Sequence, residues 1–180
     1  MKFDHLKKIY PTALLTLAII ISVSLLVISG GITQAVLESR QDQETLELLQ
    51  GIFPKTAFYY FDTDTEIYTL YNSSRSEIGH AFYGEGIGFN PRMVIIIGLE
   101  DKETIKDIIV TSQRETRWYW NRLVNSDFFD QFKELRIEDC VLKRYNNDGK
   151  VDGITGATIS CMGVVNIVRK AALEKMELLN

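Results

Sequence analysis

A stretch near the C-terminus, residues 152–160, combines turn-forming residues with hydroxyl groups. It opens with Asp-Gly, which favours a turn, and Gly156 lets the backbone approach closely to whatever lies opposite. Thr155, Thr158 and Ser160 supply hydroxyls where a helix would begin. The first N–H groups of a helix have no intrahelical partners and the helix dipole is positive there, so this stretch is a candidate phosphate site. An ordinary capped helix is the alternative interpretation.

The residues after this stretch predict a helix close to the end of the chain. Apolar residues recur at helical spacing between Val164 and Leu179. Lys170 and Lys175 lie toward the expected C-terminus of the helix, where the dipole favours cations. The candidate phosphate site would therefore be the N-terminus of a C-terminal helix.

These residues also resemble a known motif, Asp-x-x-Ser/Thr-Gly-Ala-Thr. The motif stands here as Asp152, Thr155, Gly156, Ala157 and Thr158. In the FMN-binding domain family, a flavin transferase esterifies FMN through its phosphate to the last Thr of the motif. That family includes the G subunit of the Rnf electron transport complex and the C subunit of the sodium-translocating NADH:quinone reductase. The resemblance implies that Thr158 is the attachment point and that Asp152 is part of the sequence that the transferase reads.

Further segments resemble the same family, in the same order along the chain. Aromatic and β-branched residues at 58–61 and 67–71 flank an Asp-rich turn and predict a hairpin. Its aromatic residues are expected in the core, with a stacking platform as the alternative. Residues 79–88 are rich in glycine and predict a turn that leads into a strand, because no dinucleotide-binding helix pattern follows them. Residues 93–99 are continuously apolar and predict a strand buried on both faces, with 105–111 as its partner.

The segments before the motif predict a core element and one more strand. Residues 128–132, Phe-Phe-Asp-Gln-Phe, resemble the Gln-Phe element of the family, which packs in the core. Residues 137–145 predict a strand, and residues 146–149 predict a turn. The expected fold class is therefore α+β, with an antiparallel sheet and flanking helices.

Residues 112–116, Ser-Gln-Arg-Glu-Thr, stand where the family has a Glu-Thr-Pro-Gly sequence that lines the flavin. Glu115 and Thr116 match that sequence, so the resemblance implies that both contact FMN. Arg117 and Trp118 replace Pro-Gly, and the loop must therefore have a different backbone.

Three consecutive aromatic residues follow this loop. Trp118, Tyr119 and Trp120 would supply an aromatic wall for the flavin, or would anchor the domain at a membrane surface or a partner. The sequence does not decide between these two interpretations.

The N-terminal part of the chain predicts a membrane anchor. Residues 9–37 carry no charge and exceed the roughly 20 residues needed to span a bilayer. A cleavable signal peptide would have an apolar core of only about 7–15 residues and an Ala-x-Ala site, which is missing here. Lysines precede the stretch, so residues 1–8 are expected in the cytoplasm and the rest outside. Residues 38–54 are expected to form a stalk that ends at Pro54.

Composition excludes several classes of site. The net charge is −4 and no basic run occurs, so nucleic acid is not expected as a partner. Cys140, Cys161, His5 and His80 have no spacing that builds a metal site, and no metal is expected. The cysteines would form a disulfide outside the cytoplasm or remain as two free, partly buried thiols. No nucleophile–base pairing is visible, so no catalytic residue is assigned and the chain should not attach its own flavin.

The resemblance implies a membrane-anchored electron-transfer subunit with covalent FMN on Thr158, in an Rnf-type ion-translocating complex. The Rnf-type G subunit is preferred over the reductase C subunit because the chain is short. The FMN-binding domain would occupy residues 55–180 on the outer side of the membrane. Expected partners are other membrane and redox subunits, a flavin transferase and lipid. The alternatives are a flavin-free assembly or sensory module of the same fold, or a stand-alone external flavoprotein.

Overall fold

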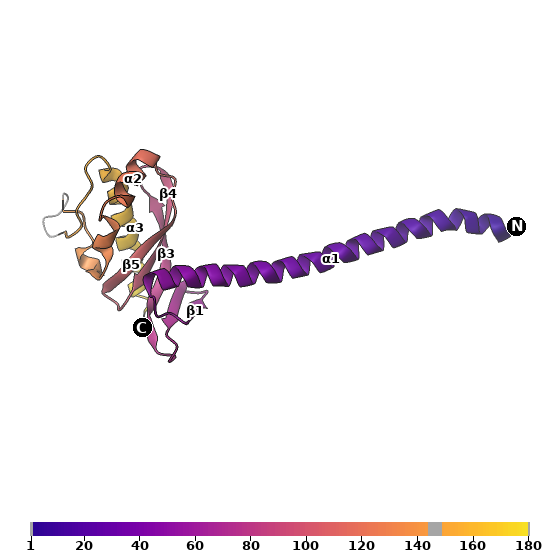
Figure 1. Ribbon diagram of the computed structural model, residues 1–180, viewed down its shortest axis with the longest axis horizontal. Helices are drawn as coiled ribbons and strands as arrows, with labels where there is room; N and C mark the ends of the chain where they lie inside the picture. Colours follow the sequence, from indigo (N-terminus) through magenta and orange to yellow (C-terminus); the bar gives the residue numbers. More distant parts are fainter. Residues whose placement is uncertain (1, 144–148, 180) are drawn as a thin grey trace. The chain divides into compact units, whose positions relative to one another are not determined.

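The computed structural model describes the backbone of residues 2–143 and 149–179 and the side chains of residues 14–27, 40–143 and 149–179. The chain divides into two compact units, Met1–Thr45 and Leu46–Asn180. Figure 1 shows the elements in sequence colours.

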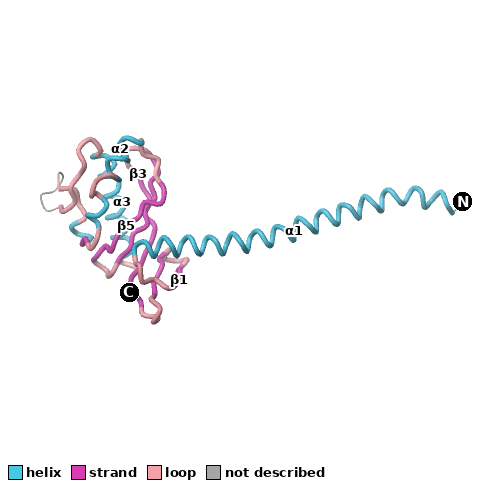
Figure 2. The backbone as a smooth tube through the Cα atoms, in the orientation of Figure 1, coloured by secondary structure: helices cyan, strands magenta, loops and turns pink. Residues whose placement is uncertain are grey.

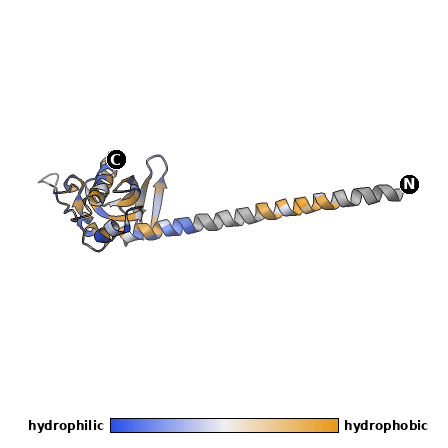
Figure 3. Cartoon of the chain, turned by 90° about the horizontal axis from the view of Figure 1, so that it is seen from above, coloured by the Kyte–Doolittle hydropathy of each residue, from blue (hydrophilic) through white to orange (hydrophobic). Residues whose placement is uncertain are grey.

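Helix α1 (Lys2–Ile52) makes up the first unit, and its last turns belong to the second. Its described side chains between residues 14 and 27 are mostly apolar and exposed, as the orange segment in Figure 3 shows. Among the described residues, no helix combines the length and apolarity that crossing a membrane requires. The predicted anchor at residues 9–37 includes side chains outside those described, and it stays a prediction.

The second unit is built on a six-stranded sheet in which every strand pairs antiparallel with the next strand of the chain. Figure 2 shows these strands in magenta. The strands are β1 (Phe58–Asp62), β2 (Ile67–Tyr71), β3 (Glu77–Ile87), β4 (Pro91–Leu99), β5 (Thr104–Ser112) and β6 (Leu135–Arg136). The predicted hairpin at 58–71 and the strand pair at 93–111 are confirmed. The α+β class is confirmed with them.

Strand β4 is buried on both faces, as its continuous apolar sequence predicts. Ile95 and Ile97 are completely buried in the larger core, whereas Ile96 is completely buried in a second core with Leu49 and Phe53. Successive side chains of a strand point to opposite faces, so both faces of the sheet are covered. Complete burial of one such side chain contributes about 1.5–3 kcal/mol.

Helix α3 (Thr158–Met176) covers the face that carries the larger core and lies against β3 and β4 (Figure 1). The close approach depends on glycine in β3. A Cβ atom on Gly86 would lie 2.5 Å from Cγ1 of Ile167, so only glycine leaves room for the helix. Most of the glycine-rich segment at 79–88 belongs to β3, so its prediction as a turn is wrong.

The remaining elements are short. Helix α2 (Arg117–Val124) follows β5, and two 3₁₀ helices, η1 (Phe129–Phe132) and η2 (Ile137–Asp139), lie on either side of β6. Phe128 and Phe132 are completely buried, which confirms the Gln-Phe element as part of the core. The strand predicted at 137–145 is wrong over its described residues, 137–143, because η2 occupies its start and only Leu142 among them forms a β-bridge, with Val151. Residues 144–148, including most of the predicted turn, lie outside the described residues.

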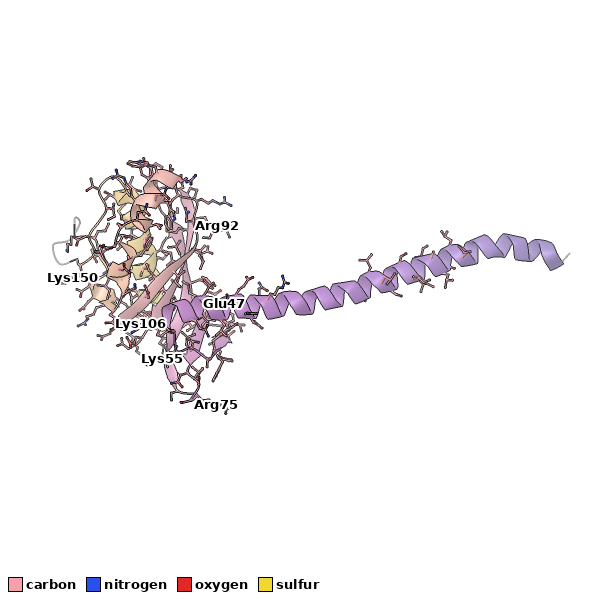
Figure 4. The ribbon with its side chains drawn as sticks, viewed as in Figure 1. Glu47, Lys55, Arg75, Arg92, Lys106 and Lys150 are labelled. Atoms are coloured by element: carbon pink, nitrogen blue, oxygen red, sulfur yellow. The ribbon has the colours of Figure 1, made fainter. Side chains whose placement is uncertain are left out.

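Charged side chains such as Arg75, Arg92 and Lys150 lie at the outer surface of the second unit (Figure 4). Lys106 on β5 forms ion pairs with Glu100 at 3.2 Å and Glu134 at 3.4 Å. Exposed ion pairs of this kind contribute little to stability, so the two cores hold the unit together. In the turn between β2 and β3, Arg75 has a positive φ of 60°.

Candidate functional site

The motif residues form a turn and the first residue of α3. Ala157 is the N-cap of the helix, Thr158 is its first residue, and no side chain caps this helix terminus. The first intrahelical bond runs from the N–H of Cys161 to the carbonyl oxygen of Ala157, at 3.0 Å. The N–H groups of residues 158–160 precede that bond and are available to an anion. The capping role expected of the motif hydroxyls is therefore absent from the described structure.

A cavity of about 260 Å³ opens at this helix terminus. Its lining residues come from the motif, from the two residues after it and from two aromatic side chains: Phe89, Tyr119, Gly156, Ala157, Thr158, Ile159 and Ser160. Three of the predicted site residues, Gly156, Ala157 and Thr158, therefore meet in one cavity. Thr158 is half-buried, so the cavity reaches it from solvent.

The aromatic wall of the cavity is made by Phe89 and Tyr119. Their ring centroids lie 4.9 Å apart with an interplanar angle of 56°. Phe89 belongs to the turn between β3 and β4, and Tyr119 to α2. The expectation of an aromatic wall after the Glu-Thr loop thus applies to Tyr119. Trp120 packs on Phe129 in the core, at 5.6 Å between centroids.

Glu115 is almost completely buried behind the cavity. Its Oε2 accepts a 2.5 Å hydrogen bond from the hydroxyl of Ser160, and its Oε1 accepts one of 3.0 Å from the backbone N–H of Asn90. The carboxylate therefore joins the start of α3 to the turn that carries Phe89. Glu115 is not among the residues that line the cavity.

Thr116 is the N-cap of α2, and its side chain is exposed. The Nδ2 of Asn90 donates to its hydroxyl at 3.3 Å and to the carbonyl oxygen of Arg114 at 2.9 Å. The two residues that replace Pro-Gly in the family sequence, Arg117 and Trp118, begin this helix. Thr116 is thus placed beside the Asn90 turn, and it is not among the lining residues.

Asp152 lies at the other end of the motif and is exposed. Its backbone N–H donates to Oε1 of Gln131 at 2.7 Å, while Nε2 of Gln131 donates to its carbonyl oxygen at 3.2 Å. Lys143 donates to its carboxylate at 2.7 Å. The Gln-Phe element therefore fixes the start of the motif, a contact that the sequence did not indicate.

Thr155 contacts a residue that sequence reasoning missed. Nη1 of Arg122 donates to the carbonyl oxygen of Thr155 at 2.5 Å, and the Arg122 guanidinium carbon lies 4.1 Å from the centroid of the Trp118 ring. Gly156 has a φ of 83°, which favours glycine, and a Cβ there would lie 2.9 Å from Nη1 of Arg122. The i, i+4 spacing of Trp118 and Arg122 was the available signal in the sequence.

The two cysteines are buried, free thiols. Burial raises the pKa of Cys140 to about 12 and also raises the pKa of Cys161. Within residues whose side chains are described, no group of three or more His, Cys, Asp or Glu is arranged to hold a metal ion.

Two sequence comparisons with known proteins agree with the motif. Residues 88–173 match the family model described as the FMN-binding domain. The chain is 27% identical to the G subunit of the ion-translocating oxidoreductase complex of Methanosarcina acetivorans, over 84% of this chain and 85% of that protein. It also resembles the crystal structure of NqrC from Shewanella oneidensis at 15% identity, with a TM-score of 0.49, over 69% of this chain and 70% of that one.

The residues at the cavity suit FMN in two respects. The uncapped N-terminus of α3 suits a phosphate, and the rings of Phe89 and Tyr119 suit an aromatic ring system. The cavity and the motif both fall within the matched range. Residues 88–173 of this chain are therefore similar to the FMN-binding domain in sequence and in the character of the cavity.

Proposed function

We propose that the chain carries FMN covalently, as a phosphoester on Thr158. The observation that carries this proposal is the placement of Thr158 at an uncapped helix terminus that opens into an aromatic-walled cavity. The matched domain range and the Asp-x-x-Thr-Gly-Ala-Thr motif support the same residue. Asp152, Thr155, Gly156 and Ala157 are the rest of the proposed attachment sequence.

The attachment needs a separate flavin transferase. The Thr158 hydroxyl attacks the phosphorus of the FMN half of FAD, the pyrophosphate bond breaks, and AMP leaves with its electron pair. The hydroxyl proton passes to a base, which the transferase must supply because the described residues around Thr158 offer no base hydrogen-bonded to its hydroxyl. Thr158 is half-buried rather than buried, which suits access by another protein.

Once FMN is attached, the N-terminus of α3 favours the remaining negative charge of the phosphodiester by about 0.3–1 kcal/mol. Phe89 and Tyr119 pack against the apolar ring system. Glu115 and Thr116 are proposed to support the flavin from behind, through Ser160 and Asn90. The isoalloxazine accepts and donates one or two electrons when bound.

The proposed role is electron transfer within a membrane-associated, ion-translocating oxidoreductase complex. The name of the Methanosarcina acetivorans relative, which aligns with most of this chain, supports this role. Covalent attachment removes the loss of flavin by dilution, which is an advantage outside the cytoplasm. The proposed partners are the other membrane and redox subunits of the complex, together with the transferase and lipid.

The proposed topology places residues 1–8 in the cytoplasm, an anchor at 9–37, a stalk at 38–54 and the flavin domain at 55–180 outside. The uncharged stretch and the lysines before it support this arrangement. A reporter enzyme fused after Asn180 should be active outside the cytoplasm. Activity confined to the cytoplasm would contradict the topology.

The attachment is tested by the intact mass of the full-length chain, made with and without a flavin transferase. The mass should rise by that of FMN less one water only when the transferase is present. Denatured wild-type protein should fluoresce as a flavin on a gel. Thr158→Ala should be dark, whereas Thr63→Ala, which removes an exposed threonine hydroxyl far from the motif in the sequence, should keep the flavin. Fluorescence that persists in Thr158→Ala would exclude that residue as the attachment point.

A further inference from the structure

Arg122 presents an unused cationic surface beside the attachment motif. The side chain extends from the last turn of α2 and lies over the ring of Trp118. Its described hydrogen bond uses one N–H, which donates to the carbonyl oxygen of Thr155. A guanidinium has five N–H donors in a planar fork, so most of its donor capacity remains for another acceptor.

The charge of Arg122 has no counter-ion among the described side chains. Among residues whose side chains are described, no carboxylate forms an ion pair with it, although several other cationic side chains of the same unit have such partners. Arg122 is exposed, yet its guanidinium is fixed at two points, the Thr155 carbonyl and the Trp118 ring. Fixing the fork in advance lowers the entropy cost of binding an anion.

Gly156 connects Arg122 to the cavity. It lines the cavity with Thr158, and the position of its absent Cβ lies 2.9 Å from Nη1 of Arg122. The guanidinium therefore packs on the backbone of the residue two positions before the attachment hydroxyl. A phosphate at the N-terminus of α3 would have the helix N–H groups on one side and this cation close by.

We propose that Arg122 is a positioning residue that recognises the flavin phosphate, and that Trp118 holds the guanidinium in place for this role. The inference rests on the proposed function, because it assigns a phosphate to the cavity at Thr158. It also states a specificity: the apo chain prefers a flavin that carries a phosphate, FMN, over riboflavin, which has the same ring system without the phosphate.

The test measures the affinity of the full-length apo chain, made without a transferase, for FMN and for riboflavin by quenching of flavin fluorescence. Wild type should bind FMN about tenfold more tightly than riboflavin, a difference of roughly 1.4 kcal/mol. Arg122→Gln should remove most of this preference and leave riboflavin affinity unchanged. Inorganic phosphate should compete with FMN in wild type and compete less in Arg122→Gln.

Two control variants separate charge, geometry and folding. Arg117→Gln removes the same charge from the same helix and should keep the preference for FMN. Arg122→Lys keeps the charge without the fork and should keep part of it. A loss of thermal stability in Arg122→Gln with an unchanged FMN-to-riboflavin ratio would show a bracing role only, and would overturn the proposal.

The outcome is distinguishable from failure of the proposed function. If wild type gains the FMN mass with a transferase but Arg122→Gln matches it in FMN preference, the Arg122 inference fails alone. If wild type gains no flavin mass at all, attachment at Thr158 fails, whatever the two affinities are. Should Arg122→Gln not fold, two other measurements decide: the ratio of FMN to riboflavin affinity in Arg122→Lys and the salt dependence of wild-type FMN binding. If that ratio equals the wild-type ratio and salt does not weaken FMN binding, the proposal is overturned.

Discussion

Two groups of aromatic side chains in the second unit pack in opposite ways. In the first, which we call the strand cluster, the ring of Tyr68 lies 4.5 Å from Phe61, 5.5 Å from Tyr59 and 6.1 Å from Tyr83. In the second, Phe89 and Tyr119 lie 4.9 Å apart and together form one wall of the 260 Å³ cavity. The rings of the strand cluster pack on one another, whereas Phe89 and Tyr119 leave space for a ligand beside them.

The difference follows from the elements that carry the rings. The strand cluster comes from β1, β2 and β3, and Phe61 is the direct register partner of Tyr68. Cross-strand neighbours of this kind lie close enough to fill the space between them. Phe89 and Tyr119 come from a turn and a helix, and the residues facing them, Gly156 and Ala157, are small. Aromatic composition alone therefore does not identify a binding wall.

Among the variants that test this difference, Glu115→Ala should have the largest effect, a loss of folding stability. The change removes the carboxylate that accepts from Ser160 and from the Asn90 N–H. Hydrogen bonds to a charged group contribute about 1.5–3 kcal/mol, so the free energy of unfolding should fall by about that amount. Urea unfolding measures the loss.

Glu85→Ala is the matched control for that variant, because Glu85 is an exposed carboxylate on β3. It should change the free energy of unfolding by no more than about 0.5 kcal/mol. If both variants behaved alike, Glu115 would not be a structural link behind the cavity.

A smaller effect is expected from Tyr119→Leu in the flavin-loaded chain. An aromatic contact contributes about 0.5–1.5 kcal/mol beyond area burial, which for a two-electron couple is about 10–30 mV. Because the flavin is held covalently, its content should stay complete while its midpoint potential and emission change. Redox titration and fluorescence measure both. Phe61→Leu, on β1 and in the strand cluster, should change neither. Equal shifts in the two variants would break the distinction between the aromatic groups.

The sequence predicts those elements whose residue pattern reflects local packing. The hairpin, the two-sided burial of β4 and the helix after the motif all follow from periodicity and turn residues. The glycines of β3 were misassigned as a turn, because the reason for them is the side chain of Ile167, which is about 80 residues away in the chain. A contact of that sequence separation leaves no local pattern.

The site was predicted in part for the same reason. Thr158 is a candidate from the sequence because it ends a contiguous motif, and the structure places Gly156, Ala157 and Thr158 on one cavity. Arg122, Gln131 and Asn90 reach the site from separate elements, and each is an ordinary polar residue in its own segment. The i, i+4 spacing of Trp118 and Arg122 indicates only their contact with each other, whereas the contacts of these three residues with the site are tertiary and leave no spacing in the sequence.

The smallest expected effect concerns the strand cluster and its response to pH. Burial, together with the nearby Tyr83 and Tyr59, raises the pKa of Tyr68 to about 12, and burial also raises the pKa of Tyr83. A raised phenol pKa means that the fold favours the neutral form. The resulting stability is fully present below the unfolded pKa of about 10 and is lost as pH rises through the folded pKa. Urea midpoints should therefore fall between about pH 10 and pH 12.

Tyr68→Phe tests this pH response, because it keeps the ring contacts but has no ionisable hydroxyl. The fall in urea midpoint should be shallower in this variant, and tyrosinate absorbance should show one late-titrating group fewer. Since Tyr68 is only half-buried, water screens part of the effect and the difference between the two proteins should be small. Equal slopes in wild type and Tyr68→Phe would mean that Tyr68 does not titrate differently in the folded chain. The strand cluster would then be less tightly closed than its ring contacts indicate, and its contrast with the open aromatic wall at Thr158 would weaken.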